Sequence, residues 1–420
     1  MREMKDSGVE WIGDIPYSWD ISTINSLYTL RNQKVSDRDY PPLSVTMKGI
    51  VPQLETAAKT DAHDDRKLVK KGDFAINSRS DRRGSCGISD YNGSVSLINT
   101  VLTPRGEMHP VYYSWLFHSS SFADEFYRWG HGIVDDLWTT RWQEMRNITI
   151  PVPEYAVQQK IAAHLDRKCT QIDALISNAQ QQIEKLKAYK QSVITETVTK
   201  GLDPDVKMKD SGVEWIGEIP ENWDTITLSS LSKGMRNGYV GPTKKLFFET
   251  GIKYIQSLHI KEGEIDFLKH EYYVSEEWAN QHPKIHTGNL LIVQTGDIGQ
   301  VAVVPDEYDN CNCHALIIVE VNNTVILSEY LSFYLQSKVG KELLLATKTG
   351  ALLPHLNSGR IGSTMVCVPP IQEQGHIIEA LNNKTALINE LINLKQQKIE
   401  KLQQYKKSLI YEYVTGKKEV

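Results

Sequence analysis

Residues 152–201 read VPEYAVQQKIAAHLDRKCTQIDALISNAQQQIEKLKAYKQSVITETVTKG, and residues 368–417 repeat the pattern as VPPIQEQGHIIEALNNKTALINELINLKQQKIEKLQQYKKSLIYEYVTGK. In both stretches apolar side chains recur at alternating steps of three and four residues. A period of 3.5 residues sustained over a whole stretch predicts a coiled-coil helix. The predicted seam consists of Leu165, Ile172, Ile176, Ile183, Leu186, Val193, Leu381, Ile388, Ile392, Ile399, Leu402 and Leu409.

Proline and glycine mark the ends of both predicted helices. Pro153 and the pair Pro369–Pro370 precede them, and Gly201 and Gly416 stand where they should stop. Each helix should be about 65–70 Å long at 1.5 Å per residue, and a single helix of that length cannot bury its own apolar stripe. We therefore expect the two helices to pack together as an antiparallel pair. The alternative is that each helix folds back on its own globular neighbour.

A shorter repeat fixes the order of the parts. Residues 4–20 read MKDSGVEWIGDIPYSWD and residues 208–224 read MKDSGVEWIGEIPENWD, identical at 14 of 17 positions. In the middle of the chain the long repeat runs into the short one, whereas at the ends the short repeat comes first and the long repeat last. Joining the termini would rebuild the central unit, which predicts two similar halves in a circularly permuted arrangement with a pseudo-two-fold axis.

Two diverged segments of similar size lie between the repeats, and both have the mixed pattern of α/β domains. Residues 71–76 and 287–292 share a turn followed by an apolar strand, 216 positions apart. The predicted class is α+β, with two similar α/β domains separated by two long antiparallel coiled-coil helices. The predicted parts are residues 1–20 (half of the connector), 21–151 (first domain), 152–201 (central helix), 202–224 (connector repeat), 225–367 (second domain) and 368–420 (C-terminal helix).

Composition is that of a soluble globular protein. Of 420 residues, 40% are hydrophobic and 24% charged, and no stretch is long and apolar enough to predict a membrane span. The first residues lack the apolar core of a secretory signal, and five cysteines suit a reducing compartment, so we expect a cytoplasmic protein. The net charge of −5 means that any nucleic-acid surface must be local.

The chain resembles the DNA specificity subunits of type I restriction-modification systems of prokaryotes over essentially its whole length. The resemblance rests on the paired VPEYAVQQKIAAHLD and VPPIQEQGHIIEALN openings, the doubled MKDSGVEWIG segment, and the alternation of globular domains with long helices. It implies that the two globular segments are target recognition domains, each reading one half of a bipartite site on double-stranded DNA. It also implies that the antiparallel helices set the distance between half-sites.

The resemblance further implies a non-catalytic subunit with two kinds of partner. Two modification subunits would carry S-adenosylmethionine and methylate adenine at N6, and restriction subunits would bring ATP and Mg²⁺. The residues agree, because the sequence contains no Asn-Pro-Pro-Tyr or Asp-Pro-Pro-Tyr motif and no Walker lysine. Cys311-Asn312-Cys313-His314 lacks a second ligand pair at zinc spacing, so no metal site is predicted. The alternatives are a coiled-coil adaptor that binds proteins and a self-sufficient enzyme fused to its own reader.

Bases are read mainly in the major groove by Arg, Lys, Asn and Gln side chains, and such residues gather in turn-rich segments of both domains. Each candidate has a plainer alternative: loop arginines are often solvated, paired lysines suit phosphates, and lone histidines are usually structural. The predicted DNA-binding residues are Arg79, Arg82, Arg83, His131 and Arg141 in the first domain, and Arg236, Asn237, Lys244, Lys245, Gln294, Thr295, His355, Asn357 and Arg360 in the second.

Overall fold

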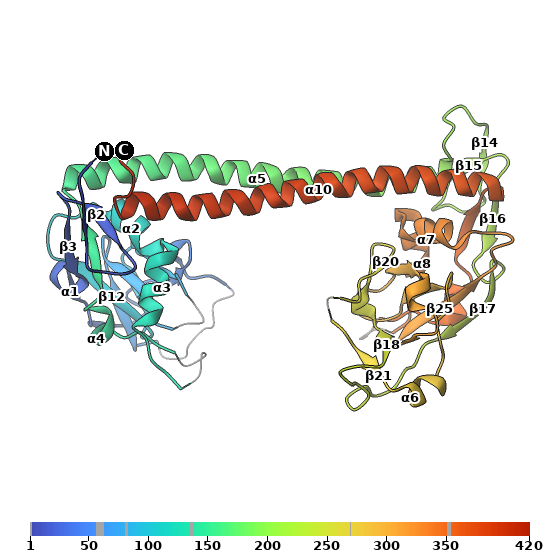
Figure 1. The fold of residues 1–420 in the computed structure, drawn as a ribbon, viewed down its shortest axis with the longest axis horizontal. Helices are drawn as coiled ribbons and strands as arrows, with labels where there is room; N and C mark the ends of the chain where they lie inside the picture. The colour runs from blue at the N-terminus through green and yellow to red at the C-terminus, as the bar shows by residue number, and fades with distance from the viewer. Residues whose placement is uncertain (1, 56–62, 80–82, 134–137, 269, 351–353) are drawn as a thin grey trace. The chain divides into compact units, whose positions relative to one another are not determined.

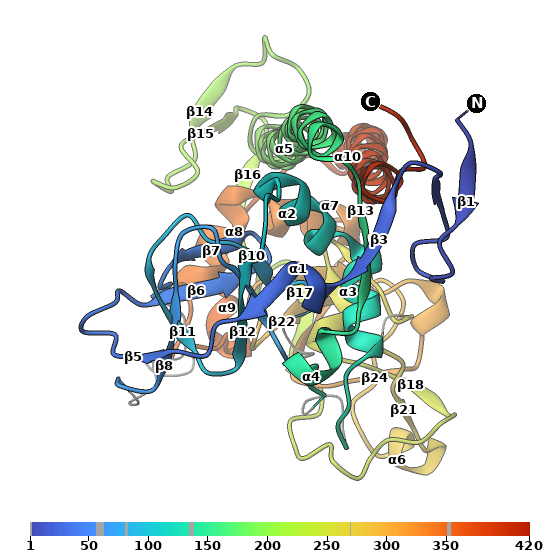
Figure 2. The same cartoon turned by 90° about the vertical axis from the view of Figure 1, so that its left-hand side faces the viewer.

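The computed structural model describes residues 2–55, 63–79, 83–133, 138–268, 270–350 and 354–420. The chain forms two compact units (Figure 1), residues 1–180 with 396–420 and residues 181–395. Both units share the long helices α5 (Tyr155–Lys200) and α10 (Ile371–Val414), each of which contributes one part to each unit. The first unit therefore holds both ends of the chain, which lie close together (Figures 1 and 2).

The long helices run antiparallel within each unit. In both units, residues later in α5 contact residues earlier in α10. This is the order of contacts that an antiparallel pair of helices requires. The expected antiparallel pairing is therefore confirmed. The contacts are His164 with Tyr413 (ring centroids 4.5 Å apart) and Asp173 with Lys406 (2.6 Å) in the first unit, and Gln182 with Lys395 (2.6 Å) and Lys190 with Asn389 (2.9 Å) in the second.

The predicted seam lies on the less exposed side of both helices. All of its members are either buried or half-buried. The buried seam residues are Leu165, Ile172, Ile183, Val193, Leu381, Ile388, Ile399 and Leu409, and the half-buried ones are Ile176, Leu186, Ile392 and Leu402.

A four-stranded antiparallel sheet frames the first unit. The frame of this unit consists of β3 (Asp20–Thr23), β4 (Tyr28–Leu30), β9 (Phe74–Asn77), β10 (Cys86–Ile88), β12 (Asn99–Pro104), α2 (Pro110–His118), α3 (Ser120–Arg128), α4 (Trp142–Met145) and β13 (Thr149–Val152). The sheet order is β10-β9-β12-β4, and β13 pairs with β3 just before α5 begins. Strands β9 and β12 are rich in buried apolar residues, as suits the centre of a sheet.

The second unit repeats this frame element by element. Its members are β16 (Asp224–Thr227), β17 (Ser232–Asn237), β22 (Leu290–Val293), β23 (Val301–Val303), β25 (Leu316–Val321), α7 (Ser328–Gln336), α8 (Lys338–Ala346), α9 (Ser358–Ile361) and β26 (Met365–Val368). The sheet order is β23-β22-β25-β17, and β26 pairs with β16 before α10 begins. Two similar α/β domains with a repeated topology were expected, and this expectation is confirmed.

Outside the common frame the two units differ. The first unit adds α1 (Ile24–Leu27), β5 (Lys34–Val35), β6 (Leu43–Thr46), β7 (Gly49–Pro52), β8 (Arg66–Val69) and β11 (Gly93–Ser96). The second unit adds β18 (Ile252–Ile255), β19 (Ile260–Lys261), β20 (Glu264–Ile265), β21 (Tyr273–Val274), α6 (Glu276–Asn280) and β24 (Asn312–Cys313). Diverged insertions on a shared frame are the expected result of two modules with related but different tasks.

The ends of both long helices are part of the domain cores. In the first unit Leu165 of α5 and Val414 of α10 join one apolar cluster with Tyr112 of α2. In the second, Val198 of α5 and Leu381 of α10 join the cluster around Tyr330 of α7. The helices thus pack on each other and, at their ends, on the domain cores.

Equivalent tyrosines in the two units bind the C-terminal ends of α10 and α5, and the repeated connectors follow the same plan in both units. Tyr112 Oη donates to the carbonyl of Val414 at 2.9 Å, and Tyr330 Oη to that of Val198 at 3.3 Å. The repeated connectors form the hairpins β1 (Met4–Asp6) with β2 (Asp14–Pro16) and β14 (Met208–Asp210) with β15 (Glu218–Pro220). After each helix the chain turns at a glycine in the left-handed region, with φ of +78° at Gly201 and +71° at Gly416.

Non-covalent contacts within the first unit hold the N-terminal connector against the end of α10. Lys417 Nζ donates to the carbonyl of Ile12 at 2.7 Å, Tyr411 Oη donates to the same carbonyl at 3.2 Å, and Arg2 donates to the carbonyl of Gly416. The N-terminal connector therefore docks on the end of α10 although no peptide bond joins them.

A buried glutamine fixes the start of each long helix. Gln374 Nε2 donates to the carbonyls of Pro369 (2.8 Å) and Val325 (3.0 Å), and its Oε1 accepts from the backbone N–H of Leu327 (2.8 Å). Gln158 makes the equivalent bonds to Pro153 (2.8 Å) and His109 (2.9 Å). These side chains tie the helix to the segment that precedes α2 or α7.

We predict that Gln374→Leu lowers the free energy of unfolding by about 1–3 kcal/mol, because buried backbone N–H and C=O groups lose their hydrogen-bond partners. Urea denaturation of the full chain, followed by tryptophan fluorescence, measures the effect. Gln372→Leu, at an exposed position of the same helix turn, is the matched control. Equal loss in both variants would contradict the proposed role of Gln374.

Candidate DNA interface

Three loops meet at one corner of the first unit. The N–H of Thr140 donates to the carbonyl of Ser78 at 2.9 Å, which joins the loop after β9 to the segment before α4. His131 and Thr139 exchange two backbone hydrogen bonds of 3.2 and 3.1 Å, which adds the segment after α3. The backbone of Arg79 also forms an isolated antiparallel β-bridge with Thr139. The structure therefore brings the predicted residues Arg79, His131 and Arg141 into one cluster.

The second unit builds the same corner with other side chains. The N–H of Leu356 donates to the carbonyl of Gln294 at 3.0 Å, 216 positions after the Thr140–Ser78 bond. Thr349 and His355 exchange bonds of 3.0 and 2.9 Å, in the place of His131 and Thr139. Gln294, Thr295, His355 and Asn357 are thereby gathered in one cluster. We refer to these two sets of joined loops as the loop clusters.

The arginines of the first loop cluster differ in their surroundings. Arg79 is exposed, and its side chain has no ion pair among the described residues. Arg83 is held against α3, because its guanidinium lies 3.0 Å from Asp124 and 4.3 Å from the centre of the Tyr127 ring. Arg82 lies outside the described residues, so its predicted contact is not addressed by the structure. Of Arg79 and Arg83, Arg79 is the better placed to reach a ligand.

His131 and Arg141 flank the short helix α4. His131 Nε2 lies 3.9 Å from Glu144 Oε1, and the N–H of Arg141 donates to Glu144 Oε2 at 2.9 Å. Both side chains are exposed. One carboxylate therefore orders both residues while leaving the arginine side chain at the surface.

In the second loop cluster the polar side chains are partly used by local structure. His355 Nε2 lies 3.1 Å from Thr349 Oγ1, and Asn357 Oδ1 accepts from the N–H of Gly359 at 2.9 Å as the cap of α9. Gln294 is half-buried, and Thr295 and Arg360 are exposed. Gln294 and Thr295 are thus the members best able to contact a ligand without breaking a local bond, and the nearby Arg360 is also exposed.

The other predicted residues lie on a separate segment. Arg236 in β17 pairs with Glu320 of β25 and donates to the carbonyl of Lys284 at 2.9 Å, so its guanidinium already has structural partners. Asn237 ends β17, and Lys244 and Lys245 follow it; all three are exposed. No hydrogen bond among the described residues joins these four to the second loop cluster. Contact of these four with DNA remains a prediction.

Sequence reasoning missed an aromatic pair beside Arg83. The rings of Tyr127 and Trp138 stack at 5.5 Å and 27°, and Trp138 Nε1 donates to the carbonyl of Tyr127 at 2.9 Å. This pair supports the loop between α3 and α4. The repeat does contain a signal for the joined loops, since Ser78 with Gln294 and Thr140 with Leu356 share the 216 offset.

The cysteines are buried thiols with raised pKa values. Burial raises the pKa of Cys169 to about 11 and those of Cys313 and Cys367 to about 12, which keeps these thiols protonated at neutral pH. Within the described parts of the chain, no group of three or more His, Cys, Asp or Glu residues could hold a metal ion. None of the helices described there is long and apolar enough to cross a membrane.

Comparison with known proteins finds a similar family model, similar sequences and a similar fold. The model of the type I restriction modification DNA specificity domain matches residues 220–404. Residues 220–404 are thus similar to this family. The chain is 26% identical over 281 residues to the type I restriction enzyme MjaVIII specificity subunit of Methanocaldococcus jannaschii, covering 64% of this chain and 62% of that protein.

Another relative and a solved structure are also similar to this chain. The EcoBI specificity subunit of Escherichia coli is 25% identical over 256 residues, covering 59% of this chain and 53% of that protein. The matches thus span between about half and two thirds of the length of these curated relatives. A solved chain from work on complex assembly and conformational transition of a type I R-M system shares the fold, with a TM-score of 0.73, 12% identity, and coverage of 95% and 98%.

The contacts of the two described arginines lead to a prediction about stability. Arg83→Ala removes an exposed ion pair and a cation–π contact, and should lower the free energy of unfolding by about 1 kcal/mol. Arg79→Ala should change it by less than about 0.5 kcal/mol, because no such partners are lost. Urea denaturation monitored by circular dichroism compares them. Equal destabilisation would show that Arg79, too, has a structural role.

Proposed function

We propose that this chain is the DNA-reading subunit of a type I restriction-modification complex. In this proposal each loop cluster reads one half of a bipartite target on double-stranded DNA. The observation that carries it is the repetition of one backbone arrangement with different side chains. Arg79 and Arg141 in the first unit stand where Thr295 and Asn357 stand in the second, and Ser78 and Thr139 stand where Gln294 and His355 stand.

The chemistry of these side chains supports direct readout. Arginine donates a pair of hydrogen bonds to guanine O6 and N7, and glutamine or asparagine pairs with adenine in the same groove. A fixed frame that holds different side chains would give each unit its own preferred sequence. Because α5 and α10 contribute to both units, we infer that they also set the spacing between the half-sites.

The partners follow from the family rather than from any contact in this chain. We propose that two modification subunits supply S-adenosylmethionine and carry out adenine N6 methylation, and that restriction subunits supply the ATP- and Mg²⁺-dependent steps. This chain would then be non-catalytic. Adenine methylation by the isolated chain with S-adenosylmethionine would contradict this assignment. A coiled-coil adaptor without DNA specificity is the rival function, and no feature of the loop clusters favours it.

We predict that Arg79→Ala and Gln294→Ala weaken recognition of different half-sites. Each lost base contact should cost about 1–3 kcal/mol in binding and relax the sequence requirement at one position. Methylation-sensitive long-read sequencing of host DNA identifies the target, and fluorescence anisotropy with target duplexes then measures the affinity of the full complex. Arg38→Ala and Gln372→Ala, both at exposed positions away from the loop clusters, are the controls.

Three other results would count against the proposal. Equal weakening on all sequences would reassign Arg79 and Gln294 to the DNA backbone. Effects of both variants on the same half-site would contradict one reader per unit. A wild-type complex with no preferred sequence would favour the adaptor.

A further inference from the structure

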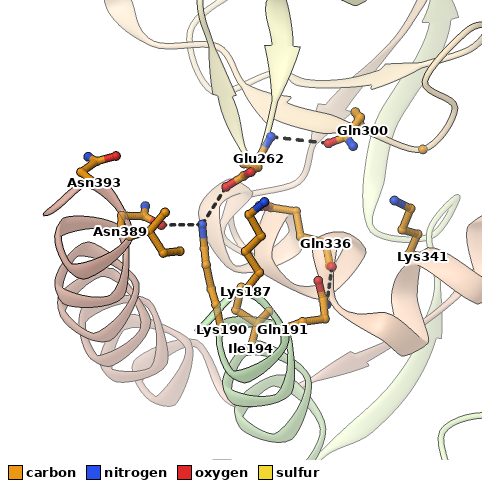
Figure 3. Close-up of a pocket in the computed structure, with 12 residues that line it drawn as sticks. Lys187, Lys190, Gln191, Ile194, Glu262, Gln300, Gln336, Lys341, Asn389 and Asn393 are labelled. Atoms are coloured by element: carbon orange, nitrogen blue, oxygen red, sulfur yellow. Dashed lines mark hydrogen bonds and ion pairs between the residues drawn. The ribbon is translucent and has the colours of Figure 1, made fainter. Parts of the chain in front are cut away.

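Each unit has a cavity at the same corner of its frame. In the second unit a cavity of about 450 Å³ lies between the long helices, α7 and α8, the β19–β20 hairpin and the loop between β22 and β23 (Figure 3). In the first unit a cavity of about 730 Å³ lies between the long helices, α2 and α3, the β6–β7 turn and the loop between β9 and β10.

The two cavities are lined by equivalent positions. Lys190 and Ile194 of α5 line one, and Lys406 and Ile410 of α10, each 216 positions later, line the other. The equivalent helices α2 and α7 each contribute their last residue to the cavity of their own unit. These residues are His118 in the first unit and Gln336 in the second. Because the overall sequences of the two domains have diverged, a cavity retained at both places is a property of the shared frame.

Both cavities carry an excess of positive charge. The second unit's cavity is lined by three lysines and one carboxylate, and the first unit's by four cations and two carboxylates, so each has two more cations than acids. The groups are Lys187, Lys190, Lys341 and Glu262 in the second unit, and Lys48, Arg83, Lys406, Lys407, Asp124 and Asp166 in the first.

One lysine in each cavity is fixed, and another has no side-chain partner. Lys190 Nζ lies 2.8 Å from Glu262 and 2.9 Å from Asn389 (Figure 3), and its hydrogen bond lowers the pKa of that glutamate. Lys341, across the cavity, has no side-chain hydrogen bond or ion pair among the described residues. Lys190 thus contributes to the wall, whereas Lys341 is available to a ligand.

The first unit repeats this division. Lys406 Nζ is held by Asp173 at 2.6 Å, and the neighbouring Lys407 is exposed without a side-chain partner in the described part of the chain. His118 adds an unused group, since its Nδ1 lies 2.7 Å from the carbonyl of Ser114 while its Nε2 is buried without a hydrogen bond.

We propose that each cavity binds a phosphate of the DNA backbone next to the half-site that its own unit reads. The inference rests on the proposed function and extends it to residues of the long helices and of α8. The loops that begin at Arg79 and Gln294 in the loop clusters continue to Arg83 and Gln300 at the cavity walls, which places both features on one short segment. Lysine suits phosphate as a point charge, and phosphate contacts position a protein without specifying sequence.

Salt dependence of binding provides the test. The full chain, purified with its modification subunits, is titrated with a random-sequence 40-bp duplex over a range of KCl concentrations. Lys341→Ala and Lys407→Ala should each weaken binding several-fold and reduce the slope of log K against log[salt] by about 0.9. The recognised sequence should stay the same. Lys384→Ala and Lys398→Ala, exposed lysines on α10 away from the cavities, should leave the slope unchanged.

Each other result has a definite meaning. Unchanged slopes for Lys341→Ala and Lys407→Ala, with wild-type recognition intact, overturn the phosphate sites and leave the proposed function standing. A changed recognition sequence in these variants also overturns them, because it would indicate base contact. If sodium tripolyphosphate raises the melting temperature of the wild-type complex but not of these variants, while DNA slopes stay equal, the cavities bind free polyphosphate and the DNA proposal is wrong. A wild-type complex that binds no DNA defeats the proposed function itself.

Discussion

Neither long helix can bury its apolar stripe alone, and this constraint governs the rest of the structure. Each unit solves it by joining the start of one helix, the end of the other and a globular core into a single apolar cluster. Leu165 and Val414 meet around Tyr112, and Leu381 and Val198 meet around Tyr330. Neither domain core is complete without both helices, so helix pairing and domain folding are coupled.

This coupling explains which parts of the sequence repeat and which diverge. The connectors, the helix ends and the buried glutamines Gln158 and Gln374 form the joints of the frame, where a changed side chain would leave buried backbone groups without partners. The loop clusters use backbone hydrogen bonds for their joints, so their side chains are free to differ. A frame that is fixed in this way can hold two readers of different sequences, as the proposed function requires.

The sequence predicted the fold because its strongest signals are local or periodic. Heptad spacing, flanking prolines and terminal glycines act within a few residues, and the order of the repeats implied the antiparallel, two-fold plan. The surroundings of the candidate side chains depend on contacts far along the chain. Arg236 of β17 forms an ion pair with Glu320 of the neighbouring strand β25, and Arg83 forms one with Asp124 of the later helix α3. No local pattern marks such pairings, so the sequence could not separate Arg79 from Arg83.

The central claim is that two units with one frame read two half-sites independently. It is tested most directly by replacing residues 225–367 with the corresponding domain of another specificity subunit and mapping methylated sites in the host genome by long-read sequencing. The account predicts a new sequence in one half of the target, with the other half retained. A change in both halves, or in neither, would contradict it.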